Sequence, residues 1–94
     1  MEASWKPQWV VRAESAAGDL VAEIGQAKRH DDLSDVWYCP ISIEAIFKNE
    51  KRIAGVDAEQ ALDLSLQFVK TVFENNGADK DSIEIKRVDG DATL

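Results

Sequence analysis

Residues 55–77, GVDAEQALDLSLQFVKTVFENNG, carry the strongest local signal in this chain. Asp57 and Gln60 have the D-x-x-Q spacing of a capping box, in which the side chains bond to free backbone N–H groups at the start of a helix. The Asn-Gly pair at the other end stops the pattern, because glycine readily takes the left-handed conformation that follows a helix. The stretch therefore predicts a helix over residues 58–75.

The predicted helix is apolar over more than half of its circumference. Its polar positions are Glu59, Asp63, Gln67, Lys70 and Glu74, and its apolar positions are Ala58, Ala61, Leu62, Leu64, Leu66, Phe68, Val69, Val72 and Phe73. A helix that lies on a single sheet needs an apolar stripe only a little over about 100° wide. We therefore expect a curled sheet, the segments around Trp5 and Ile83, or a second subunit to cover the extra surface.

Alternating residues before this helix predict an antiparallel sheet. Residues 9–15 and 20–26 each place apolar side chains on one side, and a turn at Gly18 joins them into a hairpin. Residues 36–47, VWYCPISIEAIF, have apolar residues at every odd position, which is the clearest strand pattern in the chain. Pro40 within it predicts a bulge or a local edge position, because proline lacks the N–H that a sheet requires.

The remaining segments complete the predicted organisation. Residues 27–35 predict a polar loop, residues 52–56 a short strand, and residues 82–88 a short fifth strand. The fold class is therefore α+β, an antiparallel meander of about four strands with one long C-terminal helix packed on one face. The chain forms a single domain, residues 1–94, with an N-terminal arm (1–7), the meander (8–56), the helix (57–77), and a short strand and tail (78–94).

Composition narrows the class of protein. Eleven Lys and Arg against 18 Asp and Glu give a net charge of −7, which disfavours nucleic acid and admits a basic protein partner. No apolar run approaches the ~18 residues of a membrane span, and the N-terminus lacks a signal-peptide pattern. A single cysteine suits a reducing compartment. We expect a cytoplasmic protein with no membrane partner.

Few residues of this chain are candidates for catalysis or for binding a metal or cofactor. His30, Asp31, Asp32 and Asp35 are candidate metal ligands, but a zinc site needs about three or four converging ligands, usually with Cys or several His. Cys39 lies on the apolar side of its strand, where burial makes a thiol inert. The isolated glycines form no phosphate-binding loop, and no serine sits in a nucleophile elbow. We therefore predict no catalytic, cofactor-binding or metal-binding residues and no cofactor.

Aromatic residues point to a second use for the sheet. Trp37 belongs to the inward side of its strand and is predicted to be core. Tyr38 points the other way, and with Val36, Ile46 and Trp5 it would form an apolar patch suited to an interface.

Two stretches, WYCPISI and GVDAEQALDLSL, resemble a group of small bacterial proteins of unknown function that combine a W-x-C strand with a G-x-D-x-x-Q-A-L helix. Ala27 and Ser65 depart from that pattern, where proline and alanine are usual. The resemblance implies the meander-plus-helix fold and a stand-alone bacterial cytoplasmic protein, and it implies no activity. The matching residues are Trp37, Cys39, Ile41, Gly55, Val56, Asp57, Gln60, Ala61, Leu62, Leu64 and Leu66.

Two functional hypotheses follow. The first is a non-enzymatic protein that acts by protein–protein interaction, forms a homodimer, and in a specific form is an immunity-type inhibitor of a basic partner, by analogy of size and charge. The alternative is a small-ligand binder or enzyme with its site in a cleft between helix and sheet.

Overall fold

The computed structural model describes residues 5–29 and 35–88. It confirms the α+β class, but the number of strands in the prediction is wrong. The described residues form six strands rather than about four with a possible fifth. The short strand predicted after the helix, over residues 82–88, is present at Glu84–Arg87, so the helix is not the last element of the fold. The elements are β1 (Pro7–Ser15), β2 (Gly18–Gly25), β3 (Lys28–Arg29), β4 (Trp37–Ser42), β5 (Lys51–Gly55), α1 (Ala58–Asn75), the 3-10 helix η1 (Lys80–Ser82) and β6 (Glu84–Arg87).

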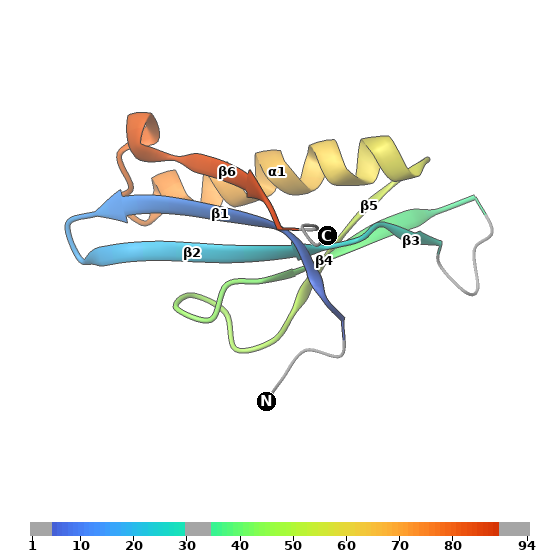
Figure 1. Ribbon diagram of the computed structural model, residues 1–94, viewed down its shortest axis with the longest axis horizontal. Helices are drawn as coiled ribbons and strands as arrows, with labels where there is room; N and C mark the ends of the chain where they lie inside the picture. Colours follow the sequence, from blue (N-terminus) through green and yellow to red (C-terminus); the bar gives the residue numbers. More distant parts are fainter. Residues whose placement is uncertain (1–4, 30–34, 89–94) are drawn as a thin grey trace.

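The strands form one antiparallel sheet in the order β5–β4–β2–β1–β6. The short strand β3 pairs with β4 on the same side as β2 does, but further along β4. α1 packs against β5, β4 and β2, and Figure 1 shows it running along one side of the sheet. We call this side the helix face and the opposite side the outer face. The hydrophobic core lies between the helix face and α1.

β1 and β2 form the predicted hairpin. Val11 pairs with Ala22 and Ala13 pairs with Leu20, and all four side chains are buried. Gly18 begins β2 with a φ of +120°, a conformation that residues with a Cβ rarely adopt. Because side chains alternate along a strand, the residues between these core positions face outward.

The predicted strand over residues 36–47 is wrong in its second half. β4 ends at Ser42, and the carbonyl of Ile43 then accepts from the N–H groups of Ile46 at 3.0 Å and Phe47 at 2.8 Å. This is a turn of helical type, in which positions i, i+3 and i+4 lie on one side. Ile46, which the strand pattern placed on the outer face, therefore packs against the core with Phe47.

Pro40 lies in a central strand, at a point where one side of that strand is locally unpaired, which agrees with the prediction. β5 pairs along one side of β4. On the other side, the β2 pairing stops at Ile41 and the β3 pairing starts at Tyr38, so the ladder is interrupted at Cys39 and Pro40. The interruption is expected there because proline has no N–H to donate. Beyond it, the segment predicted as a loop over residues 27–35 contributes the two-residue strand β3.

Both ends of α1 agree with the sequence prediction. Asp57 Oδ1 accepts from the backbone N–H of Gln60 at 2.7 Å. Gln60 Oε1 accepts in return from the N–H of Val56 at 2.8 Å, one residue further back than in the usual capping box. At the other end, Gly77 follows the cap residue Asn76 with a φ of +88°.

Gly55, the last residue of β5, allows the helix to approach the strand closely. A Cβ placed on Gly55 would lie 2.6 Å from the backbone nitrogen of Ala61. No larger residue fits without moving the helix, so this glycine fixes the spacing between β5 and the first turns of α1.

The wide apolar surface of α1 is covered within the chain. Phe47 stacks against Phe68 with ring centroids 6.2 Å apart, and Ile83 packs against the core. Leu64, 37% exposed, is the one apolar residue of the helix with more than about a third of its surface in solvent. The β4–β5 connection and the segment around Ile83 therefore cover the flanks. The fully buried helix residues are Ala61, Ser65, Val69 and Phe73.

Candidate functional site

The metal-binding candidates from the sequence do not form a described cluster. His30, Asp31 and Asp32 lie outside the described residues, and Asp35 is exposed. Within residues 5–29 and 35–88, no three His, Cys, Asp or Glu side chains are grouped so that they could hold a metal ion.

Cys39 is buried, as predicted. Its side chain is 1% exposed on the helix face, and burial raises the pKa of its thiol, partly offset by a hydrogen bond with Ser65. A raised pKa keeps the thiol protonated at neutral pH, and only the thiolate is a good nucleophile. The contact joins β4 to α1, because Ser65 is one of the buried residues of the helix and also donates to the carbonyl of Ala61 at 2.7 Å.

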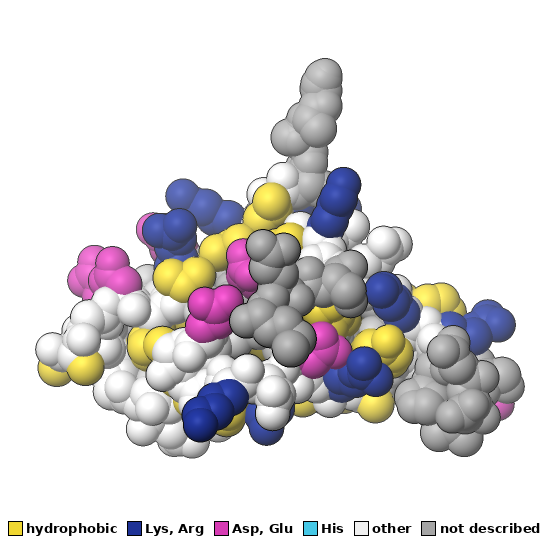
Figure 2. Space-filling model, turned by 90° about the horizontal axis from the view of Figure 1, so that it is seen from below, with side chains coloured by type: hydrophobic (Ala, Val, Ile, Leu, Met, Phe, Trp, Pro, Cys, Tyr) yellow, Lys and Arg dark blue, Asp and Glu magenta, His cyan; other side chains and the backbone are white. Residues whose placement is uncertain are grey.

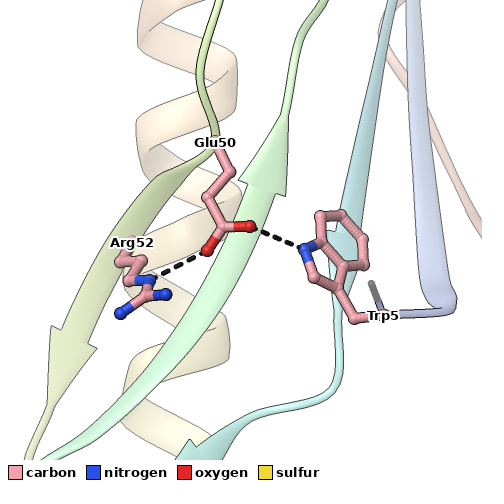
Figure 3. Close-up of polar contacts among 3 residues, drawn as sticks. All are labelled: Trp5, Glu50 and Arg52. Carbon is pink, nitrogen blue, oxygen red and sulfur yellow. Dashed lines mark hydrogen bonds and ion pairs between the residues drawn. The ribbon is translucent and has the colours of Figure 1, made fainter. Parts of the chain in front are cut away.

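A polar cluster on the outer face holds the start of the described chain against the sheet (Figure 3). Trp5 Nε1 donates to Glu50 Oε1 at 2.9 Å, and Arg52 Nε donates to Glu50 Oε2 at 2.8 Å. A Cβ on Gly25 would lie 2.7 Å from the ring of Trp5, so the indole packs directly on the β2 backbone. Since Trp5 and α1 lie on opposite sides of the strands, Trp5 does not cover the helix as the sequence suggested.

Two further features complete this cluster. The hydrogen bonds from Arg52 and Trp5 lower the pKa of the Glu50 carboxyl. The Arg52 guanidinium also lies 4.9 Å from the ring centroid of Tyr38, within cation–π range. Tyr38 therefore lies on the outer face as predicted, but it is half-buried beneath a charged side chain, and the apolar patch predicted with Ile46 does not form.

A concavity lies on the outer face, between β2 and the turn that follows β4. We call this hollow of about 420 Å³ the acidic hollow, because three carboxylates and no cation line it. Figure 2, which looks at this face, shows Asp and Glu side chains on its left and central parts, with Lys and Arg side chains near them. The lining residues are Asp19, Val21, Glu23, Ser42, Glu44 and Ala45.

The acidic character extends to the neighbouring strand. Glu14 and Asp19 are direct cross-strand partners in the β1–β2 hairpin, and like charges in that position destabilise a sheet. A second hollow of about 140 Å³ shares Asp19 and is also lined by Glu14 and Glu84, with Arg12 as its one cation. The chain therefore accepts a repulsive contact at this end of the outer face.

A third concavity lies at the other end of the sheet, between the helix face and the first turn of α1. This cleft has a volume of about 290 Å³, and we call it the tryptophan cleft. Trp37, predicted to be core, is only half-buried because it forms one wall. The lining residues are Gln8, Trp9, Gly25, Gln26, Ala27, Trp37, Ala58, Glu59 and Leu62.

Cations lie beside both tryptophans of this cleft. The Arg29 guanidinium is 5.5 Å from the ring centroid of Trp37, and that of Arg87 is 5.4 Å from the ring centroid of Trp9. Glu59 is the one charged residue in the lining. The surroundings of the tryptophan cleft are therefore more positive than those of the acidic hollow.

Sequence reasoning missed the acidic hollow, although this hollow left a signal in the sequence. The predicted hairpin turn at Gly18 fixes the register, and that register places Glu14 opposite Asp19. The acidic hollow also needs Glu44 and Ala45, which reach it only because the chain turns after Ser42. The alternative hypothesis placed a site in a cleft between helix and sheet, where the tryptophan cleft lies. It named no lining residues, since Trp9, Trp37 and Glu59 come from three separate elements.

In the described part of the chain, no helix has the length and apolar content that crossing a membrane requires. Comparison of the chain with protein-family models, with curated proteins and with solved structures finds no match in any of the three.

Proposed function

We propose that this chain is a non-enzymatic interaction protein whose acidic hollow binds a basic segment of a partner protein. The observation that carries the proposal is the concentration of carboxylates in a concave part of the outer face, where Asp19, Glu23 and Glu44 converge around the exposed side chain of Val21. Lysine and arginine side chains of a partner would meet opposite charge at the rim and an apolar contact at the centre.

The cross-strand contact between Glu14 and Asp19 supports this role. In the free protein the two carboxylates repel each other. A cation placed between them would remove that repulsion and add attraction, so binding would stabilise a part of the sheet that is strained by charge in the free state. The net charge of −7 would also speed the encounter with a basic protein.

In its most specific form, the partner is a basic toxin and this chain is its immunity-type inhibitor, in the bacterial cytoplasm. The size and acidity of the chain are the basis for this form. A toxin gene beside the gene for this chain would favour it.

A short peptide of alternating lysine and alanine tests the acidic hollow directly. Its affinity is measured by calorimetry for the wild type and for a triple variant, Asp19→Asn, Glu23→Gln and Glu44→Gln. We expect the triple variant to bind at least about tenfold more weakly, and the wild-type affinity to fall steeply with salt, because the attraction is between partly exposed charges.

A matched control separates the hollow from net charge. The substitutions Asp63→Asn, Glu74→Gln and Asp81→Asn remove the same number of charges from exposed positions in α1 and η1. We expect this control to stay within about twofold of the wild-type affinity. An equal loss in both triple variants would show that the peptide responds to total charge, and the proposed site would be wrong.

The tryptophan cleft supports the second candidate function, a binder of a small ligand between helix and sheet. Its two indole walls and the arginines beside them favour an aromatic carboxylate. Titration with benzoate and with benzylammonium, followed by NMR of the indole N–H groups, tests this. Benzoate should shift Trp9 and Trp37 and leave Trp5 on the outer face unmoved, whereas no shift with either probe excludes this ligand class.

A further inference from the structure

β6 is an edge strand that pairs with β1 along one side. Among the described residues, no strand pairs with its other side. Ile85, at the middle of β6, is 37% exposed. An unpaired edge with an exposed apolar side chain readily accepts another strand, and proteins usually protect such edges.

The backbone of Ile85 points toward this open edge. The N–H of Val88 donates to the carbonyl of Gln8 on β1 at 2.8 Å. Residues of an antiparallel pair bond to each other at alternate positions, so Lys86 and Glu84 also direct their backbone groups toward β1. The N–H and C=O of Ile85, between them, are therefore directed away from β1.

The side chains of β6 alternate between the two faces of the sheet. Ile85 lies opposite Val11, which is buried on the helix face, so Ile85 lies on the helix face as well. Glu84 and Lys86 lie on the outer face and are separated by one residue. The acidic residue therefore precedes the central Ile85 and the basic residue follows it. Two antiparallel copies of such a strand place the acidic residue of each copy opposite the basic residue of the other.

We propose that a second copy of this chain pairs with β6 edge to edge about a two-fold axis, with Ile85 opposite the partner's Ile85. This arrangement places Glu84 opposite the partner's Lys86, and Lys86 opposite the partner's Glu84. The two central residues exchange two backbone hydrogen bonds. The result is one continuous antiparallel sheet across both copies, with an isologous contact, the commonest kind in homodimers.

Charge selects this register over its neighbours. The backbone N–H and C=O groups that point to the open edge of β6 belong to its odd-numbered residues. A second copy can therefore pair only in registers in which odd-numbered residues lie opposite odd-numbered residues. A shift one way places Glu84 opposite the partner's Glu84, and a shift the other way places Lys86 opposite the partner's Lys86. Like charges directly opposite destabilise a sheet, and opposite charges stabilise it. The proposed register is the one in which both outer-face pairs attract.

The other edge of the sheet lacks this complementarity. β5 carries the cations Lys51 and Arg52 and no acidic residue, so two copies of it would bring like charges together, whereas β6 carries Glu84 as well as its cations. This contrast favours β6 over β5 as the surface for a second copy. The dimer predicted from the sequence had a different basis, namely the apolar surface of α1 that a single sheet would leave uncovered.

Sedimentation equilibrium with charge-swap variants tests the register. The mass of the wild type should rise from 10.4 kDa toward twice that value as the concentration increases through the micromolar range. Glu84→Lys and Lys86→Glu should each remain near 10.4 kDa, because each variant alone places like charges opposite one another. An equal mixture of the two variants restores both opposite-charge pairs, and its mass should rise as that of the wild type does.

The mixture is also the control for folding, because it contains only chains that fail to pair separately. Glu84 lies opposite Arg12 within the chain, so urea unfolding of each variant records any loss of stability. In hydrogen exchange, protection of the Ile85 amide should increase with concentration, while that of Lys86, already bonded to β1, should not change. A wild-type mass that never rises, or variants that pair as the wild type does, would overturn the proposal. The result is independent of the acidic hollow, whose test leaves Glu84 and Lys86 intact.

Discussion

The two faces of this one sheet are built from the same strands and serve different ends. On the helix face, Val11, Ile24 and Ile41 are fully buried against α1. On the outer face, alternate residues of β1 and β2 include several charged side chains, and Glu14 stands opposite Asp19. Burial of apolar surface favours one conformation strongly, whereas exposed charges change stability little. Substitutions on the two faces should therefore separate stability from binding.

The largest effect is expected on the helix face. Phe73→Ala should lower the free energy of unfolding by about 3–5 kcal/mol, since it empties a site that is completely buried at the end of α1. Urea unfolding measures it. Val21→Ala is the matched apolar truncation on the outer face, and it should cost well under about 1.5 kcal/mol because Val21 is already 38% exposed. Similar losses in both variants would contradict the division between the faces.

A smaller effect is expected at the junction between β5 and α1. Asp57→Ala removes the acceptor for the Gln60 N–H and should lower stability by about 1 kcal/mol. Asp63→Ala, in the exposed middle of the same helix, should change stability by less than about 0.5 kcal/mol. The binding of the lysine peptide should be unchanged, because Asp57 is not part of the acidic hollow. A midpoint for Asp57→Ala that equals the wild-type midpoint would show that the cap contributes nothing.

The polar cluster of Trp5, Glu50 and Arg52 should make the free energy of unfolding depend on pH. The pKa of Glu50 is lowered, so its stabilising contribution is complete above the ordinary glutamate pKa and disappears as pH falls through the lowered value. The difference in stability between the wild type and Glu50→Gln should therefore shrink as pH falls from about 6 to about 3. The indole N–H signal of Trp5 should shift over the same range, while those of Trp9 and Trp37 should not follow it. A constant difference across this range would mean that the carboxylate is not the group that titrates.

The smallest effect is expected to have the opposite sign. Asp19→Asn removes one member of the like-charge pair and should raise stability by a few tenths of a kcal/mol at low salt. The gain should vanish at high salt, where exposed charges are screened. The same variant should weaken binding of the lysine peptide. A variant that is less stable than the wild type would mean that Asp19 has a structural role in the turn.

The elements that the sequence predicted best are those specified by neighbouring residues. The capping box at Asp57, the stop at Gly77 and the hairpin turn at Gly18 each depend on contacts within a few positions. The alternating residues of β1 and β2 also fixed which side chains are buried, because one register places all of them inward.

The errors arose where distant segments decide the outcome. Residues 43–47 alternate as a strand would, yet Ile43, Ile46 and Phe47 also have helical spacing, and contact with the core selects the turn. This outcome cannot be read from the local pattern, because the same residues fit both spacings and the core that they contact is built from segments far away in the chain.

The sequence by itself therefore determined the α+β class, the limits of α1 and the first hairpin, because caps, turns and alternation act over short distances. Only the tertiary structure decided that Trp5 lies on the outer face, that the flanks of α1 are covered by Phe47 and Ile83, and that carboxylates from β2 and the turn after β4 share one hollow. These features depend on the relative placement of elements far apart in the chain, and packing against the single core sets that placement.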